Sequence, residues 1–403
     1  MNQDHEPQLH IPRGFSFSAA TAGIKASGKP DLALAIAAKG TSAAAVFTSN
    51  RVVAAPIEVG REHLAWSRGK IRAVVVNSGN ANCATGKAGY AACKQICSVI
   101  GENAGVPIQQ VFPSSTGIIG VPFPAEKILA HLPQLMAQAE ASEKAVRAFV
   151  GAIMTTDLRP KLASAQFKFA GKPISILGIA KGAGMIHPQM ATMLVYLFTD
   201  VQASPSLLKT HLREAVDGSL NCISIDGDTS TNDTALLLAS GSSGVALQSA
   251  SARARFRDSL AEVCRSLATQ IVADGEGVRH VVRLLVQQAR SGEEADRVAR
   301  TIAHSLLVKT AWAGADPNWG RILAAIGNSG VRLDPARVNI FFGKQQVCRK
   351  GEAVSFDEHS AHVYLSQPRY EITIQLGRGK SHCEFLTCDL TTEYVHINAD
   401  YST

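Results

Sequence analysis

Residues 181–200 read KGAGMIHPQMATMLVYLFTD, and the expectations for the rest of the chain start from this segment. It begins as a Gly-interrupted loop, passes Ala191 and Thr192, and becomes an apolar run of strand character from Met193 to Phe198. If the peptide bond before Thr192 were cut, a free α-amine with a reference pKa of roughly 7.7–8.0 would lie beside the Thr192 hydroxyl. One residue could then supply both nucleophile and base.

The same segment is suited to self-cleavage. The hydroxyl of Thr192 can attack the carbonyl of Ala191 through a five-membered ring, in an N-to-O acyl shift that water completes. Ala191 offers little steric hindrance to this attack, and no second protein is needed. On these residues alone, an ordinary Thr at the start of an apolar strand is the competing interpretation.

Further segments extend along nearly the whole chain. Together with the central segment they resemble the ornithine acetyltransferase family, in the family's order: FTSNRVVAAP from Phe47, VNSGNANCATG from Val76, SSTGIIG from Ser114, TTD from Thr155, DGDTSTND from Asp226, DGEG from Asp274, VKTAWAGADPNWGRI from Val308, and the ending INADYST. Members of that family are bifunctional arginine-biosynthesis enzymes that cleave themselves at Ala-Thr and acetylate glutamate. Two departures, Ala183 for a frequent Ser and Gln189 for a frequent Asn, leave the Ala-Thr pair and Lys181 intact.

Composition indicates a compact globular protein. At 403 residues the chain exceeds one typical domain, so two are expected. Hydrophobic residues make up 46% and charged residues 18%, which is enough apolar content for a substantial core. The net charge is +7, but Lys and Arg are scattered and aromatic residues are only 6%, so no nucleic-acid partner is expected. The start MNQDHEPQLH lacks secretory-signal features and no apolar run reaches membrane-helix length, which predicts a cytoplasmic enzyme with no membrane partner.

Neither a disulfide framework nor a cofactor is predicted. The eight cysteines form no C-x-x-C pair, and Cys93 and Cys97 are expected to be buried thiols on one helix face. Asp226, Asp228 and Asp233 lack the spacing and the closing Glu of a calcium loop, so a turn or helix cap is expected there and no metal.

The alternation of apolar runs predicts a layered α/β fold. Strands are expected at 71–77, 173–180 and 193–198, with helices at 87–102 and 205–218. The family resemblance implies an αββα catalytic domain like that of N-terminal-nucleophile hydrolases but with distinct connectivity, at about 11–278, and a smaller C-terminal α/β domain at 279–403. Self-cleavage would divide the chain into an α piece, 1–191, and a β piece, 192–403.

The segment SSTGIIG offers a hydroxyl at Thr116 and an unobstructed N–H at Gly117, which suits two donors aimed at an oxyanion. A simple turn is the interpretation that the residues alone favour, whereas the resemblance implies an oxyanion hole formed by this pair. The loop VNSGNANCATG is interpreted either as a tight connection or as part of the site.

Substrate-binding residues follow from charge and from the resemblance. Lys181 could form a charge-assisted bond with an α-carboxylate, and Glu276 could pair with the cationic end of ornithine. Either side chain could instead be merely solvated. The resemblance also assigns a substrate contact to Thr155, with Thr156 as the alternative register.

The ending INADYST would ordinarily be taken for a mobile tail. The resemblance instead implies that Asn398 and Thr403 reach the substrate.

The resemblance implies transfer of acetyl from N2-acetylornithine to glutamate through an acetyl-Thr192 intermediate, in an assembly of two α and two β pieces. Whether acetyl-CoA also serves as donor is left open. Two alternatives remain on sequence grounds: a self-processing N-terminal-threonine aminopeptidase or amidase, and a non-catalytic amino-acid-binding protein.

Overall fold

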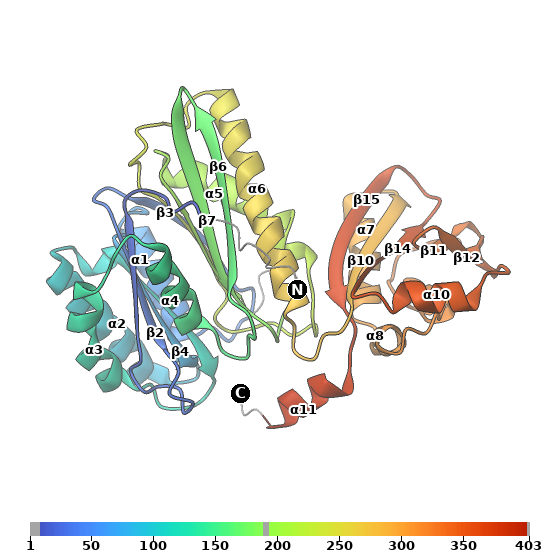
Figure 1. The fold of residues 1–403 in the computed structure, drawn as a ribbon, viewed down its shortest axis with the longest axis horizontal. Coiled ribbons are helices and arrows are strands. Elements are labelled where there is room, and N and C mark those ends of the chain that lie inside the picture. The colour runs from blue at the N-terminus through green and yellow to red at the C-terminus, as the bar shows by residue number, and fades with distance from the viewer. Residues whose placement is uncertain (1–8, 188–192, 401–403) are drawn as a thin grey trace, which may run out of the picture.

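The computed structural model describes residues 9–187 and 193–400. Its larger part contains two sheets that lie face to face (Figure 1). The first sheet has the order β1–β2–β4–β5, in which β4 and β5 are parallel and the other neighbours are antiparallel. Its strands are β1 (Phe15–Ala20), β2 (Leu32–Ala37), β4 (Ala73–Asn80) and β5 (Val111–Ile118).

The second sheet has the order β3–β9–β8–β7–β6, so strands from before and after residue 192 are interleaved in it. Only β8 and β9 are parallel. The strands are β3 (Ser42–Phe47), β6 (Lys161–Phe169), β7 (Lys172–Lys181), β8 (Leu194–Thr199) and β9 (Thr234–Ala239). The continuous apolar run that predicted β8 therefore belongs to a central strand.

Strand β8 shows why this run does not alternate between apolar and polar residues. Tyr196 and Phe198 face the first sheet and join the core between the sheets, whereas Val195 and Leu197 join the core on the opposite face. All four are fully buried. A strand covered on both faces needs apolar residues at every position, so the usual alternation disappears.

Helices cover the outer faces of both sheets. The core outside the first sheet contains side chains of α1 (Ala55–Trp66), α2 (Gly86–Ala104) and α3 (Ala125–Ala137), and the core outside the second contains side chains of α5 (Pro205–Asp217) and α6 (Ala250–Ala273). Helix α4 (Glu143–Ile153) packs into the core between the sheets. The predicted helix–sheet–sheet–helix layering is confirmed.

A third sheet forms a separate body at the C-terminal end (Figure 1). Its strands, in spatial order, are β13 (Glu352–Ala353), β12 (Gln345–Arg349), β11 (Asn339–Phe342), β14 (Arg369–Gln375), β10 (Val281–Ala289) and β15 (Ser381–Cys388). One hydrophobic core joins this sheet to α7 (Gly292–Ala303), α8 (Leu306–Ala313), α9 (Trp319–Gly327) and α10 (Glu358–Leu365).

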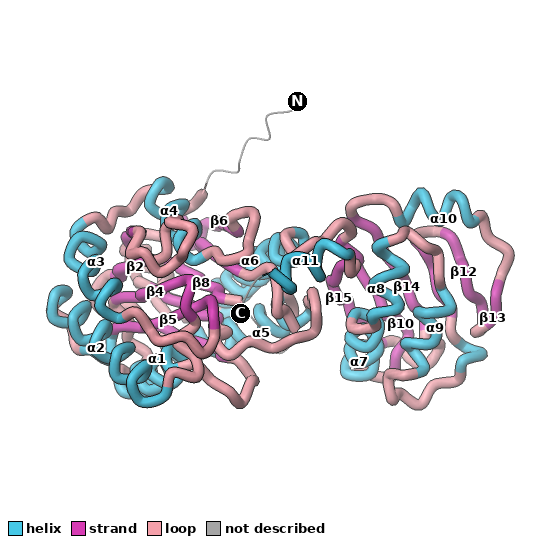
Figure 2. Tube along the Cα trace, turned by 90° about the horizontal axis from the view of Figure 1, so that it is seen from below, coloured by secondary structure: helices cyan, strands magenta, loops and turns pink. Residues whose placement is uncertain are grey.

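The last helix, α11 (Thr392–Asp400), leaves this body and lies between it and the two-sheet body (Figure 2). Short 3₁₀ turns lie at Ile108–Gln110, Leu220–Cys222 and Pro335–Arg337. None of the helices in the described ranges is long and apolar enough to cross a membrane.

Candidate active site

A pocket of about 210 Å³ lies where the ends of β5 and β7 meet the turn after α6 and the helix α11. It is lined by seven residues that the sequence singled out: Thr116, Gly117, Thr155, Thr156, Lys181, Glu276 and Asn398. They come from segments spread over more than half the chain. The pocket does not distinguish Thr155 from Thr156, since both line it.

Thr116 and Gly117 lie near the end of β5. Nζ of Lys181 donates to Oγ1 of Thr116 over 3.2 Å, and because a hydroxyl can accept and donate at once, the Thr116 hydrogen remains able to point to another acceptor. Gly117 has φ +131°, and a Cβ there would lie 2.5 Å from the backbone nitrogen of Asn80. Only glycine fits this position, where β5 lies close against β4.

Lys181 is the buried cation of the pocket, with 4% of its surface exposed. Burial lowers the pKa of its ammonium group, an effect that the carboxylate of Asp157 opposes. Lys181 thus places its amino group at the end of β7, where an incoming carboxylate would compensate for part of the cost of burying its charged form.

Glu276 contributes a carboxyl group to the pocket from the turn after α6. Its backbone N–H donates to the carbonyl of Ala183 over 2.8 Å, and its Oε2 accepts a bond of the same length from Asn398. A Cβ on Gly184 would lie 2.5 Å from the Glu276 Cδ, so glycine at 184 leaves room for this carboxylate.

Asp226 and Tyr394 are pocket residues whose roles the sequence interpretation missed. The Asp226 carboxylate accepts from the backbone N–H groups of Met185 and Ile186, and the Tyr394 hydroxyl donates to it over 3.3 Å. Burial raises the pKa of Asp226 to about 6, although the backbone donors favour its charged form. The motif DGDTSTND drew attention to this loop. The hydrogen bonds from residues 185 and 186 to Asp226 could not be predicted from it, because those residues lie about 40 positions earlier in the chain.

Asn232, in the same motif, joins the two sheets at the pocket. Its side-chain amide donates to the carbonyls of Ala81 and Ser115, at 2.7 and 2.9 Å. The loop VNSGNANCATG, to which Ala81 belongs, thus takes part in the pocket wall as well as connecting β4 to α2.

Ala191, Thr192 and Thr403 lie outside the described residues. Strand β8, which follows Thr192, begins at Leu194. Leu194 pairs with Lys181 across β7 and β8. The strand that follows Thr192 therefore begins beside a pocket residue.

The pocket contains the Thr116 hydroxyl beside the amino group of Lys181, and it is also lined by the carboxyl group of Glu276. Such a site suits an amino-acid derivative that carries a carboxylate and a cationic group, and it places a hydroxyl donor where an oxyanion could be stabilised. Charged groups of both signs inside one small pocket favour a polar substrate over an apolar one.

Comparisons with known protein sequences match nearly the whole chain. A family model described as the ArgJ family matches residues 16–403. The arginine biosynthesis bifunctional protein ArgJ of Methylococcus capsulatus is 44% identical over 97% of this chain and 95% of its own, and that of Thermus thermophilus is 43% identical over 98% and 100%. The crystal structure of the corresponding protein of Bacillus halodurans is 37% identical, with a TM-score of 0.50 over 52% of this chain and 100% of that chain.

Proposed function

The chain belongs to the ArgJ family, and from this premise we propose that it is an acetyltransferase of arginine biosynthesis that transfers acetyl from N2-acetylornithine to glutamate. The residue-level chemistry below is part of this proposal. So are the folded units at about 11–278 and 279–403, the assembly of two α and two β pieces, and a cytoplasmic location.

Maturation precedes catalysis. The hydroxyl of Thr192 attacks the carbonyl carbon of Ala191, the peptide C–N bond breaks as an ester forms on Oγ, and the released amine takes the proton. Water hydrolyses this ester, which leaves a carboxylate on Ala191 and restores the hydroxyl of Thr192. The new α-amine lies beside the hydroxyl that it will activate.

In the first half-reaction the Thr192 amine accepts the Oγ proton while Oγ attacks the acetyl carbonyl of N2-acetylornithine. The Thr116 hydroxyl and the Gly117 N–H donate to the oxyanion. The C–N bond then breaks, the proton passes to the amine of ornithine, and acetyl remains on Thr192 as an ester.

In the second half-reaction glutamate enters the emptied pocket and its neutral α-amine attacks the ester. N-acetylglutamate leaves, and Thr192 Oγ regains a proton. Lys181 binds the α-carboxylate of either substrate, and Glu276, with Asn398 beside it, faces the cationic end of ornithine. We assign Thr155 and Thr403 to the substrate as well. Acetyl-CoA would deliver acetyl to the same residue, and we expect it to be the poorer donor.

The observation that carries this proposal is the 3.2 Å contact between Lys181 Nζ and Thr116 Oγ1, inside the pocket that Glu276 also lines. It supports one site in which carboxylate binding and oxyanion stabilisation are adjacent. The strand pairing of Lys181 with Leu194 supports Thr192 as the nucleophile of that site.

Intact mass under denaturing conditions tests maturation. Cleavage before Thr192 divides the 42.6 kDa chain into pieces of 191 and 212 residues, about 20 and 22 kDa by proportion, and a Thr192→Ala chain should remain whole. Active protein with a single intact mass would overturn the mechanism.

A transfer assay separates the enzyme classes. Ornithine and N-acetylglutamate should form in equal amounts from acetylornithine and glutamate, with ping-pong kinetics. Release of acetate at the same rate with and without glutamate would instead identify an amidase.

A further inference from the structure

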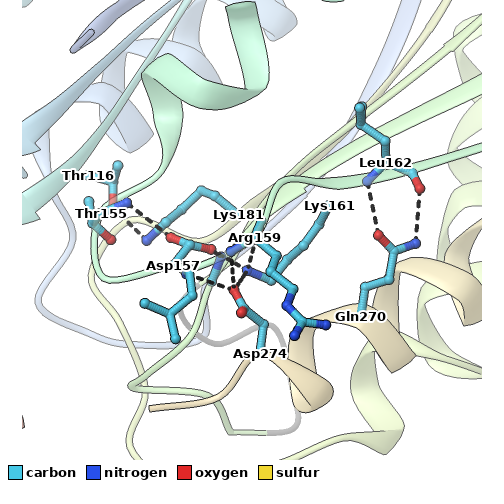
Figure 3. Close-up of polar contacts among 11 residues, drawn as sticks. Thr116, Thr155, Asp157, Arg159, Lys161, Leu162, Lys181, Gln270 and Asp274 are labelled. Atoms are coloured by element: carbon cyan, nitrogen blue, oxygen red, sulfur yellow. Dashed lines mark hydrogen bonds and ion pairs between the residues drawn. The ribbon is translucent and has the colours of Figure 1, made fainter. Parts of the chain in front are cut away.

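Close to the pocket, Lys161 lies between two carboxylates. Its Nζ is 2.6 Å from Oδ1 of Asp157 and 2.6 Å from Oδ2 of Asp274, and all three side chains are almost fully buried (Figure 3). Lys161 does not line the pocket. Nothing in the proposed chemistry uses it.

Each carboxylate also holds the backbone of a loop that carries a pocket residue. Asp157 accepts from the N–H of Thr155 at 3.0 Å and from that of Gly182 at 2.7 Å, next to Lys181. It therefore joins the loop after α4 to the end of β7.

Asp274 makes the second connection. Its Oδ2 accepts from the N–H groups of Leu158 and Arg159, at 3.0 and 3.1 Å, and Asp274 itself opens the turn in which Glu276 lies two residues later. The loop of Thr155 and the turn of Glu276 are thus fixed to each other through one carboxylate.

Gln270, one turn earlier on α6, adds a neutral pair of bonds between the same elements. Its side-chain amide accepts from the N–H of Leu162 at 3.1 Å and donates to the carbonyl of Leu162 at 2.9 Å (Figure 3). These bonds hold β6 against α6 without Lys161, so the fold of these elements does not depend on the ammonium group alone.

The electrostatics make Lys161 hard to replace. Burial disfavours a charged carboxyl at Asp157, but Lys181 and Lys161 hold the pKa of Asp157 at about 2. Without Lys161, two buried carboxylates would lose their shared counter-ion, and an uncompensated buried charge is strongly unfavourable. The loops would move to let water reach them.

We propose that Lys161 is a positioning residue: through Asp157 and Asp274 it sets the relative positions of Thr155, Lys181 and Glu276, and so controls how tightly the pocket binds its amino-acid substrates. This inference rests on the proposed function for its substrates. Its geometry does not depend on that function, because the three loops are joined by contacts of described residues.

The test compares Lys161→Met and Asp274→Asn with Arg378→Met, a control that removes a partly buried ion pair of 2.7 Å with Glu294 in the C-terminal body. Two quantities are measured: KM and kcat for acetylornithine and glutamate, and amide hydrogen exchange of peptides from 155–159, 181–187 and 274–277. For the exchange measurement alone, every variant is also made in the Thr192→Ala background, so that a change in cleavage does not confuse the comparison.

We expect Lys161→Met to raise KM for both substrates roughly 10- to 100-fold, with kcat changed much less, because loops displaced by about an ångström bind poorly. Exchange should speed up in all three peptides together, while β7 and β8 keep their protection. Asp274→Asn retains an acceptor for Leu158 and Arg159, so a smaller change in the same direction is expected. Arg378→Met should leave KM and the three peptides unchanged.

Unchanged KM and exchange in Lys161→Met would overturn the inference, and so would faster exchange spread evenly over the core. If Lys161→Met does not fold, Asp274→Asn decides by the same criteria. If the wild-type protein transfers no acetyl group, the proposed function fails, but calorimetric affinity for L-ornithine and the exchange pattern still decide whether Lys161 positions the loops.

Discussion

Asn398 donates a hydrogen bond of 2.8 Å to Oε2 of Glu276, although 122 residues separate the two in the chain. The bond holds α11 against the turn after α6, and both residues line the pocket. The C-terminal helix is therefore a wall of the site, which the predicted role of the ending INADYST requires.

Substitution at this contact should discriminate between the two substrates. We expect Glu276→Gln to raise KM for acetylornithine about tenfold or more, because hydrogen bonds to charged groups contribute about 1.5–3 kcal/mol. Glutamate has no cationic side chain, so its KM should change little. Steady-state rates with each substrate varied in turn measure this, and equal effects on both would contradict the assignment of Glu276 to the cationic end.

Gly184→Ala should displace the carboxylate of Glu276 without changing its chemistry. The added methyl group meets the flexible end of Glu276, so the fold should survive while the carboxylate is displaced. We expect a several-fold higher KM for acetylornithine and a nearly unchanged melting temperature. Gly327→Ala, where nothing lies within 4 Å of the new Cβ, is the matched control and should alter neither quantity.

Thr116→Ala removes the side-chain donor proposed for the oxyanion and leaves Lys181 Nζ without this acceptor. Loss of one such donor typically lowers kcat roughly 10²- to 10³-fold. Ornithine release under saturating substrates checks this, and Thr116→Ser should recover much of the rate. Unchanged turnover in Thr116→Ala would remove Thr116 from the mechanism.

His304 should contribute a loss of stability on mild acidification, whereas Asp226, with its raised pKa, contributes in the opposite direction. Burial, reinforced by the neighbouring His187, lowers the pKa of His304 from 6.5 to about 4. Between these values the unfolded chain binds a proton that the folded chain does not, so the free energy of unfolding decreases as pH falls through this window.

His304→Gln should reduce this pH dependence. Between pH 7 and pH 5 we expect the variant to lose on the order of 1–2 kcal/mol less than the wild-type protein. Urea unfolding at both pH values measures the difference. Exposed His359 in α10 provides the control, since His359→Gln should follow the wild-type curve.

The sequence predicted those features whose signal is local. The apolar run from Met193 identified β8, and helical spacing identified α2 and α5 to within two residues. Short helices such as α8, α9 and α10 were missed, because eight or nine residues carry little periodicity.

In the site, too, residues in local motifs were predicted and residues that depend on distant contacts were not. Thr116, Lys181 and Glu276 were found through motifs, and the structure brings them into one pocket. Lys161 was not found, because a Lys at the start of a strand looks solvated and its partner Asp274 is 113 residues away. The role of Asp226 was missed for the same reason, since its hydrogen-bond donors are backbone N–H groups of another loop.

The interleaved order of the second sheet bears on when the chain can mature. Strand β3 lies beside β9, and β7 beside β8, so each half of the chain completes the backbone pairing of the other. Residues as far as β9 must therefore have left the ribosome before this sheet can close, so we expect the proposed scission to follow synthesis of β9. After cleavage the two polypeptides should stay together on dilution, because their separation would break the backbone hydrogen bonds between β3 and β9 and between β7 and β8. We therefore expect residues 1–191 and 192–403, expressed from separate genes, to give little active enzyme, because the uncut chain is the species that folds.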